Sequence, residues 1–268
     1  MASSTKAKTK TKPTATTATA TATRAPDPAP PPPERPYGHG GRRPGAGRKR
    51  TLPGPPREPH RARPPHDPQH PVHVVLQLAE DIGSLRRDEA YAAVRLAMIA
   101  VALAGRRDFR MVHVSIQRHH VHLLVEADDA LALANGVRAL GVSLARRLNA
   151  LVSEERGVRR RRRAFADRYR ASTITSPREA RHALVYVLNN WRRHGEDHAA
   201  SGARRARLDR YASGSAFAGW AERDAPLDAP PELAPLPTAP PMTWLLQEGW
   251  QQGGPAPSVW EVPAPLTA

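Results

Sequence analysis

The chain has 268 residues, and its 41 lysines and arginines against 25 aspartates and glutamates give a formal net charge of +16 at pH 7. The absence of cysteine excludes a disulfide scaffold, a thiolate metal site and cysteine catalysis. We expect a cytoplasmic protein, because Thr/Ala/Pro sequence follows the basic start and the most apolar helix candidate is too short for a bilayer.

Proline divides the chain into three regions. Prolines crowd both ends of the chain, whereas residues 72–176 contain none. Residues 1–71 form a basic region, rich in Thr, Ala and Pro, that we predict to be disordered. Residues 72–198 are long enough to bury one core and form the predicted folded domain. Residues 199–268 are predicted to be a largely disordered, Pro-rich tail.

The first half of the folded region predicts three strands and a helix. A strand begins at Val72, where apolar residues alternate with their neighbours. Apolar residues then recur at three- and four-residue spacing over residues 87–105, which predicts a helix. Alternation returns over residues 109–117 and 119–127, and the short spacing between these two strands predicts a hairpin around Arg118.

The second half predicts two helices around an extended segment. A long helix is predicted over residues 129–155, and residues 165–174 are predicted to be a short strand or extended. A final helix begins at Ser176, where Glu179 completes a capping box, and runs to about His194.

This order of elements predicts an α+β fold of the ferredoxin-like or RRM-like kind, with an antiparallel sheet and helices on one face. If the aliphatic residues of the strands face the helices, four histidines lie together on the open face. They are His73, His113, His120 and His122. Four imidazoles on one surface favour a site there over a plain solvent face.

Two groups on different elements could carry chemistry. His120 and His122 alternate on a strand, so their side chains project to the same side with Cβ atoms roughly 7 Å apart, close enough to reach one cation. On the last helix, Tyr186 lies off the apolar stripe and Asn190 follows one turn later. The tyrosine oxygen could attack a phosphodiester with a divalent ion as its aid, and Asn190 could be a third ligand. The alternatives are two ordinary surface histidines and a tyrosine that stacks on the sheet edge.

The charge of the folded region favours a polyanionic partner. Residues 72–198 contain 22 arginines against 14 acidic residues, and each phosphate that a basic residue neutralises releases counterions. The densest run follows the long helix and predicts a phosphate-binding segment, with a solvated linker as the alternative. Its members are Arg159, Arg160, Arg161, Arg162 and Arg163.

Three blocks together resemble the single-tyrosine HUH transposases, the insertion-sequence-200-like family, especially its branch associated with repetitive extragenic palindromes (REP). The blocks are His119–Glu126, Phe165–Tyr169 and Tyr186–Asn190. The resemblance implies a bacterial enzyme that nicks and rejoins single-stranded DNA next to hairpins, acts as a homodimer and uses Mg²⁺ or Mn²⁺. It also implies that His120, His122 and Asn190 hold the ion and that Tyr186 is the nucleophile.

Three further residues are candidates for the site. Arg168, in the second block, joins the DNA-binding candidates. His113 and Glu126 share the predicted sheet face of the histidine pair and are candidates to support the metal ligands, and for Glu126 a plain sheet-surface position is the favoured alternative. Relatives often have a His where Arg170 stands, which affects fine positioning in the site. Residues 243–250 resemble a short docking helix of some relatives, and a remnant in a Pro-rich tail is the alternative.

Three other functions are less consistent with the residues. A histidine-triad nucleotide hydrolase needs a third His where Leu124 stands, and a two-histidine phosphoesterase needs a second partner for the His113–Ser115 repeat. The remaining alternative is a non-catalytic DNA-binding protein, a domesticated or decayed transposase that keeps the fold and the charge.

Overall fold

The computed structural model describes residues 58, 63, 65–196, 208–222 and 234–264. The chain divides into two units, residues 1–54 and 55–268, and every described residue belongs to the second unit. The predicted disorder of residues 1–71 therefore falls almost entirely outside the described residues.

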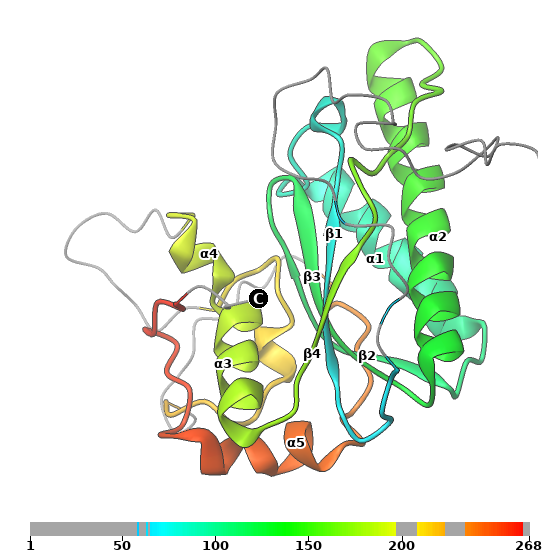
Figure 1. The fold of residues 1–268 in the computed structure, drawn as a ribbon. Helices are drawn as coiled ribbons and strands as arrows, with labels where there is room; N and C mark the ends of the chain where they lie inside the picture. Colours follow the sequence, from blue (N-terminus) through cyan, green and yellow to red (C-terminus); the bar gives the residue numbers. More distant parts are fainter. Residues whose placement is uncertain (1–57, 59–62, 64, 197–207, 223–233, 265–268) are drawn as a thin grey trace, which may run out of the picture. The chain divides into compact units, whose positions relative to one another are not determined.

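Four antiparallel strands form one sheet in the order β2-β3-β1-β4 (Figure 1). Their bounds are Val72–Gln77 for β1, Phe109–Ile116 for β2, His120–Ala127 for β3 and Arg170–Thr173 for β4. Helix α1, Asp88–Leu103, follows β1, and helix α2, Ala130–Arg156, follows β3. The resulting β-α-β-β-α-β order confirms the predicted ferredoxin-like fold.

Helices lie on both faces of the sheet (Figure 1). Helices α1 and α2 cover one face, as expected, and share a core with the inward aliphatic residues of β1 and β3. The final helix lies against the other face, where its apolar side packs on Val112 and Leu124. It is broken at Asn189 into α3, Pro177–Leu188, and α4, Asn190–Arg193. Within the described residues, no helix is long and apolar enough to cross a membrane.

Local chemistry fixes the ends and the packing of α2. The Asp129 side chain caps its start by accepting a hydrogen bond of 2.7 Å from the Ala132 N–H. Gly157 ends the helix with a left-handed φ of 63°, which costs glycine little. Inside the helix, Gly136 lets Phe109 pack on the backbone, because a Cβ there would lie 2.2 Å from the Phe109 ring.

The face of one β2 residue differs from the expected alternation. Strict alternation over residues 109–117 would place Val112 beside Val114 and Ile116, but Val112 packs with Leu124 and α3 on the opposite face. An irregularity in the β2–β3 register between Met111 and His113 accounts for this difference. Such a bulge shifts side-chain parity by one residue, and alternation alone cannot reveal it.

The C-terminal region also differs from the predicted disordered tail. Residues 208–222 and 234–264 pack against the domain and bury Trp220, Trp250 and Val259. Three short helices lie in these stretches: η2, Gly214–Ala216, α5, Trp244–Gln247, and η3, Gly249–Gly253; η1, Glu80–Ile82, follows β1. The apolar residues of α5 and η3 cover α3, which agrees with the docking alternative for residues 243–250. The sequence did not predict this packing, because the proline-rich stretches contain no apolar pattern of helix or strand period long enough to recognise.

Candidate active site

Three histidines of the sheet form a contiguous cluster on the face covered by α3. His73 on β1 and His122 on β3 stack with ring centroids 5.1 Å apart, and His73 Nε2 lies 3.0 Å from His122 Nδ1. His120 meets His122 edge to face with centroids 4.6 Å apart. The hydrogen bond to His73 orients the His122 ring, and a partner of this kind also selects the tautomer of a metal-binding histidine.

Tyr186 on α3 lies against this cluster within the same chain. Its ring meets His122 edge to face with centroids 5.3 Å apart, and His73 with centroids 5.8 Å apart. Tyr186 is only partly buried, whereas its neighbours Val185 and Val187 are in the core. The fold therefore brings together the phenol and the imidazoles that lie more than sixty residues apart in the sequence.

Asn190 belongs to the same row of α3 and α4 residues. Tyr186 lies one turn before it and contacts His122, and His194 lies one turn after it with its ring 5.4 Å from His120. Asn190 thus lies in the chain between two residues that both contact the histidine cluster, just after the break at Asn189, and it is fully buried.

Several buried polar atoms of this region have no hydrogen-bond partner among the described residues. They are His122 Nε2 and both side-chain amide atoms of Asn190. Native proteins rarely leave such atoms unsatisfied, and an ion is one explanation. No group of three or more His, Asp or Glu side chains within the described ranges could hold a metal. The candidate ligand set instead combines two imidazoles with one amide oxygen, and the orphaned His122 Nε2 and Asn190 Oδ1 fit it, whereas the Asn190 Nδ2 is a donor and does not.

The surroundings keep the imidazoles uncharged. Burial lowers the pKa of His120 to about 4, with smaller contributions from His194 and His119. Burial also lowers the pKa of His73 to about 4, and it lowers the pKa of His122 well below the usual value, helped by its histidine neighbours. Near pH 7 these rings are therefore neutral, which is the form that can bind a metal ion.

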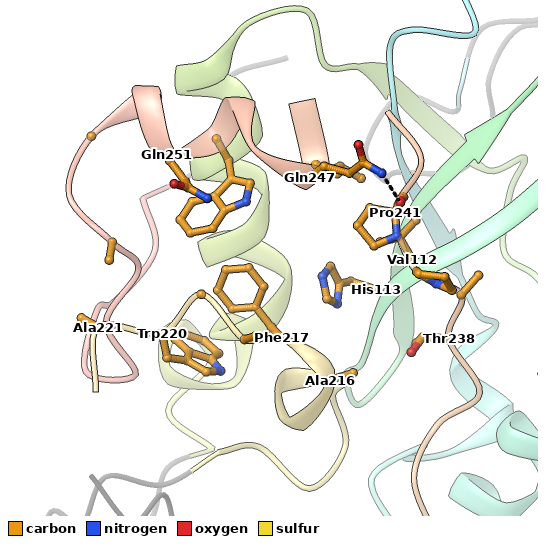
Figure 2. Close-up of a pocket in the computed structure, with 18 residues that line it drawn as sticks. Val112, His113, Ala216, Phe217, Trp220, Ala221, Thr238, Pro241, Gln247 and Gln251 are labelled. Carbon is orange, nitrogen blue, oxygen red and sulfur yellow. Dashed lines mark hydrogen bonds between the residues drawn. The ribbon is translucent and has the colours of Figure 1, made fainter. Parts of the chain in front are cut away.

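His113 lies in a different environment from the cluster. Its Nδ1 is 3.2 Å from Ser213 Oγ, and its ring meets Phe217 edge to face. Figure 2 shows it at a cavity of about 990 Å³ lined by C-terminal residues such as Trp220 and Gln247. The expected role of His113 behind the metal ligands is not supported by these contacts, because the C-terminal chain, which the sequence did not place, occupies its surroundings.

Glu126 likewise serves the C-terminal chain. Its carboxylate is fully buried, accepts hydrogen bonds from the Met242 N–H (2.8 Å), the Thr243 N–H (2.9 Å) and the Thr243 hydroxyl (2.8 Å), and pairs with Arg110. None of these partners is a histidine of the cluster. Glu126 is an anchor for the turn that begins α5 and not a support for the ligands.

The arginine run is divided between structural and exposed residues. Arg160 is buried, pairs with Asp81 through two nitrogens and donates to the Arg162 and Arg163 carbonyls, so its guanidinium holds the loop together. The other four arginines of the run, Arg159, Arg161, Arg162 and Arg163, are exposed. Asp81 lies in η1 just after β1, whose last residue pairs with His120. The run thus lies at the same end of the sheet as the cluster. Arg168 is partly buried in the loop before β4.

The sequence predicted no role for two histidines of the site, His73 in the cluster and His194 beside it. His73 was placed on the correct face, but its pairing with His122 depends on the β1–β3 register, which the sequence does not give. His194 could have been found, because it follows Asn190 by four residues and so continues the row from Tyr186.

Comparison with known proteins adds a family match. Residues 70–190 match the model of a family described as IS200-like transposases. The chain is similar to the structure of a REP-associated tyrosine transposase bound to a REP hairpin, with 16% identity over 52% of this chain and 75% of that one and a TM-score of 0.38. It is also similar to a protein of Deinococcus radiodurans R1 described as a transposase, with 17% identity over 48% of this chain and 92% of that one and a TM-score of 0.33. No curated protein matches the chain.

Proposed function

We propose that the protein is an IS200-like transposase that cuts and rejoins single-stranded DNA near hairpins through a covalent phosphotyrosine, a proposal supported by the match of residues 70–190 to that family. The observation that carries the proposal is the contact between the Tyr186 ring and His122, with centroids 5.3 Å apart. A nucleophile and metal-binding imidazoles must reach one scissile phosphate, and this contact places the Tyr186 and His122 rings side by side.

Tyr186 is the nucleophile in this proposal. Its phenolic oxygen attacks the phosphorus of one phosphodiester and loses its proton, while the bond from phosphorus to one sugar oxygen breaks and that oxygen takes up a proton. The energy of the broken bond is kept in the phosphotyrosine. A sugar hydroxyl can attack this bond in turn, which releases Tyr186 and joins two DNA ends. The cut is therefore reversible.

His120, His122 and Asn190 are the side chains that would hold a divalent ion, Mg²⁺ or Mn²⁺, whose chemistry is to polarise the phosphate and stabilise its added charge. The orphaned Nε2 of His122 and the orphaned amide of Asn190 support this assignment. His73 orients His122 through the 3.0 Å contact between their ring nitrogens. The proposal includes the homodimer that the resemblance implies, and within one chain Tyr186 contacts His122.

The test is to trap the covalent intermediate. The full-length protein is incubated with Mn²⁺ and single-stranded oligonucleotides that each contain one hairpin, and the products are separated under denaturing conditions. We expect a protein–DNA adduct that disappears in Tyr186→Phe and in the presence of EDTA. An adduct that persists in Tyr186→Phe would assign the nucleophile to another residue.

A non-catalytic DNA-binding protein is the second candidate. The net charge of +16 favours it as much as it favours the enzyme, because charge alone supplies nonspecific affinity. The same experiment separates the two, since a binding protein shifts the oligonucleotide in a native gel and yields no adduct.

A further inference from the structure

Residues 253–263, which we call the C-terminal clamp, run along the side of α3 (Figure 1, red). At the first turn of α3, the backbone of Gly253 approaches Pro177 so closely that a Cβ would lie 2.3 Å from the Pro177 carbonyl oxygen. Farther along the clamp, Val259 is fully buried. The clamp therefore packs on α3 as a part of the domain.

An ion pair holds the clamp to the middle of α3. Both terminal nitrogens of Arg181 donate to the two carboxylate oxygens of Glu261, at 2.9 and 2.8 Å. The Arg181 Nε donates to the Pro255 carbonyl at 2.6 Å. Arg181 thus joins two points of the clamp, and its paired geometry fixes direction as well as distance.

A second set of contacts lies at the break between α3 and α4. Asn189 is the buried residue at this break, and its side-chain nitrogen donates to the carbonyls of Ser258 (2.8 Å) and Glu261 (3.0 Å). The Arg192 Nε donates to the Val259 carbonyl at 2.6 Å. The clamp therefore holds α3 on one side of the break and α4 on the other.

The position of this break matters because Tyr186 precedes it and Asn190 follows it. The angle between α3 and α4 decides where the phenol lies relative to the orphaned Asn190 amide, and the contacts of Asn189 set that angle. We propose that the C-terminal clamp is a positioning device for the active site, with Arg181 and Asn189 as positioning residues that hold Tyr186 and Asn190 in register with His122. This inference rests on the proposed function.

A charge swap tests the clamp in the full-length chain. Arg181→Glu and Glu261→Arg each replace the ion pair with two like charges, and the double variant restores opposite charges in reversed order. Arg178→Glu is the control, because Arg178 is an exposed arginine of the same helix and the substitution makes the same charge change as Arg181→Glu. The measurements are the thermal midpoint, the Kd for a hairpin-containing single strand, and the rate constant of adduct formation at saturating DNA.

A misplaced nucleophile slows the reaction without weakening DNA binding. We expect each single variant to lower the rate constant about tenfold or more, with a Kd like that of Arg178→Glu, and the double variant to recover most of the loss. An unchanged rate constant in both single variants would overturn the inference. So would a loss that the double variant does not recover, because it would reflect the individual charges and not the pair.

A second measurement judges the clamp without DNA. Amide hydrogen exchange at the α3–α4 break should be faster in each single variant than in the unmodified protein, and slow again in the double variant. If the unmodified protein forms no adduct, the proposed function fails, and unchanged exchange in the single variants would then reject the clamp as well. Faster exchange with no adduct would reject the transposase function and leave the clamp as a support of α3 alone, which overturns its active-site role.

Discussion

At the scale of single residues, the sequence placed the chemical groups better than their supports. The spacing of His120 and His122 on a strand, and of Tyr186 and Asn190 on a helix, follows from periodicity, so these four could be proposed together. The support of His122 could not, because the pairing with His73 is set by strand register. Burial of the Asn190 amide without a partner likewise depends on tertiary packing.

Replacement of His122 should separate chemistry from binding. His122→Ala should reduce adduct formation by more than about 100-fold, because even the outer partners of metal ligands are worth 10- to 100-fold. DNA affinity should change little. The matched control is His113→Gln, a buried histidine of the same sheet face that contacts Ser213 and lies outside the cluster. Titrations of a labelled single strand and quantified adduct yields measure the two effects. Equal losses of binding and cleavage in His122→Ala would mean that the histidine is structural.

At the scale of elements, periodicity predicted the first three strands and the two helices of the sandwich, and it left residues 165–174 as a short strand or extended segment, where β4 covers Arg170–Thr173. Three features escaped it. The bulge near Met111 has no sequence signal, the break at Asn189 lies within a continuous helical pattern, and residues 208–222 and 234–264 bury aromatic residues from irregular backbone. All three are decided by contacts between distant segments, which local patterns do not encode.

Glu126 makes one such long-range contact with the C-terminal chain, and its contribution to the free energy of unfolding can be measured. Glu126→Gln keeps the size of the side chain but removes the charge that pairs with Arg110, and the new amide donor faces the N–H groups of Met242 and Thr243. We expect a loss of roughly 3 kcal/mol in the free energy of unfolding, as for other broken buried ion pairs. Urea denaturation measures it. Asp128→Asn removes an exposed carboxylate beside the same arginine and should cost less than about 0.5 kcal/mol. A similar small loss in Glu126→Gln would show that the anchor contributes little.

At the scale of the whole molecule, the described residues include two groups of largely exposed arginines at different places on the domain. One group is the exposed part of the arginine run, at the end of the sheet that carries His120. The other lines a groove on the outer side of α2, whose inner side packs on the sheet. Its members are Arg106, Arg138, Arg146 and Arg147. If only the net charge of the molecule matters for DNA affinity, the loss of either group should have the same effect. If DNA follows a defined path to the active site, the group on that path should matter more.

Two variants with equal charge loss decide between these possibilities. The first replaces Arg159, Arg161, Arg162 and Arg163 with glutamine, and the second makes the same change at Arg106, Arg138, Arg146 and Arg147. Each phosphate contact to a single strand contributes about 0.7 to the slope of log affinity against log salt, so four lost contacts should flatten the slope by up to about 3. We expect that flattening in the first variant for all DNA sequences, and a much smaller change in the second. The measurement is fluorescence anisotropy with a labelled single strand over a series of salt concentrations. Equal slopes in the two variants would mean that the run makes no local contact with DNA, and that its charge acts on binding only through the net charge of the molecule.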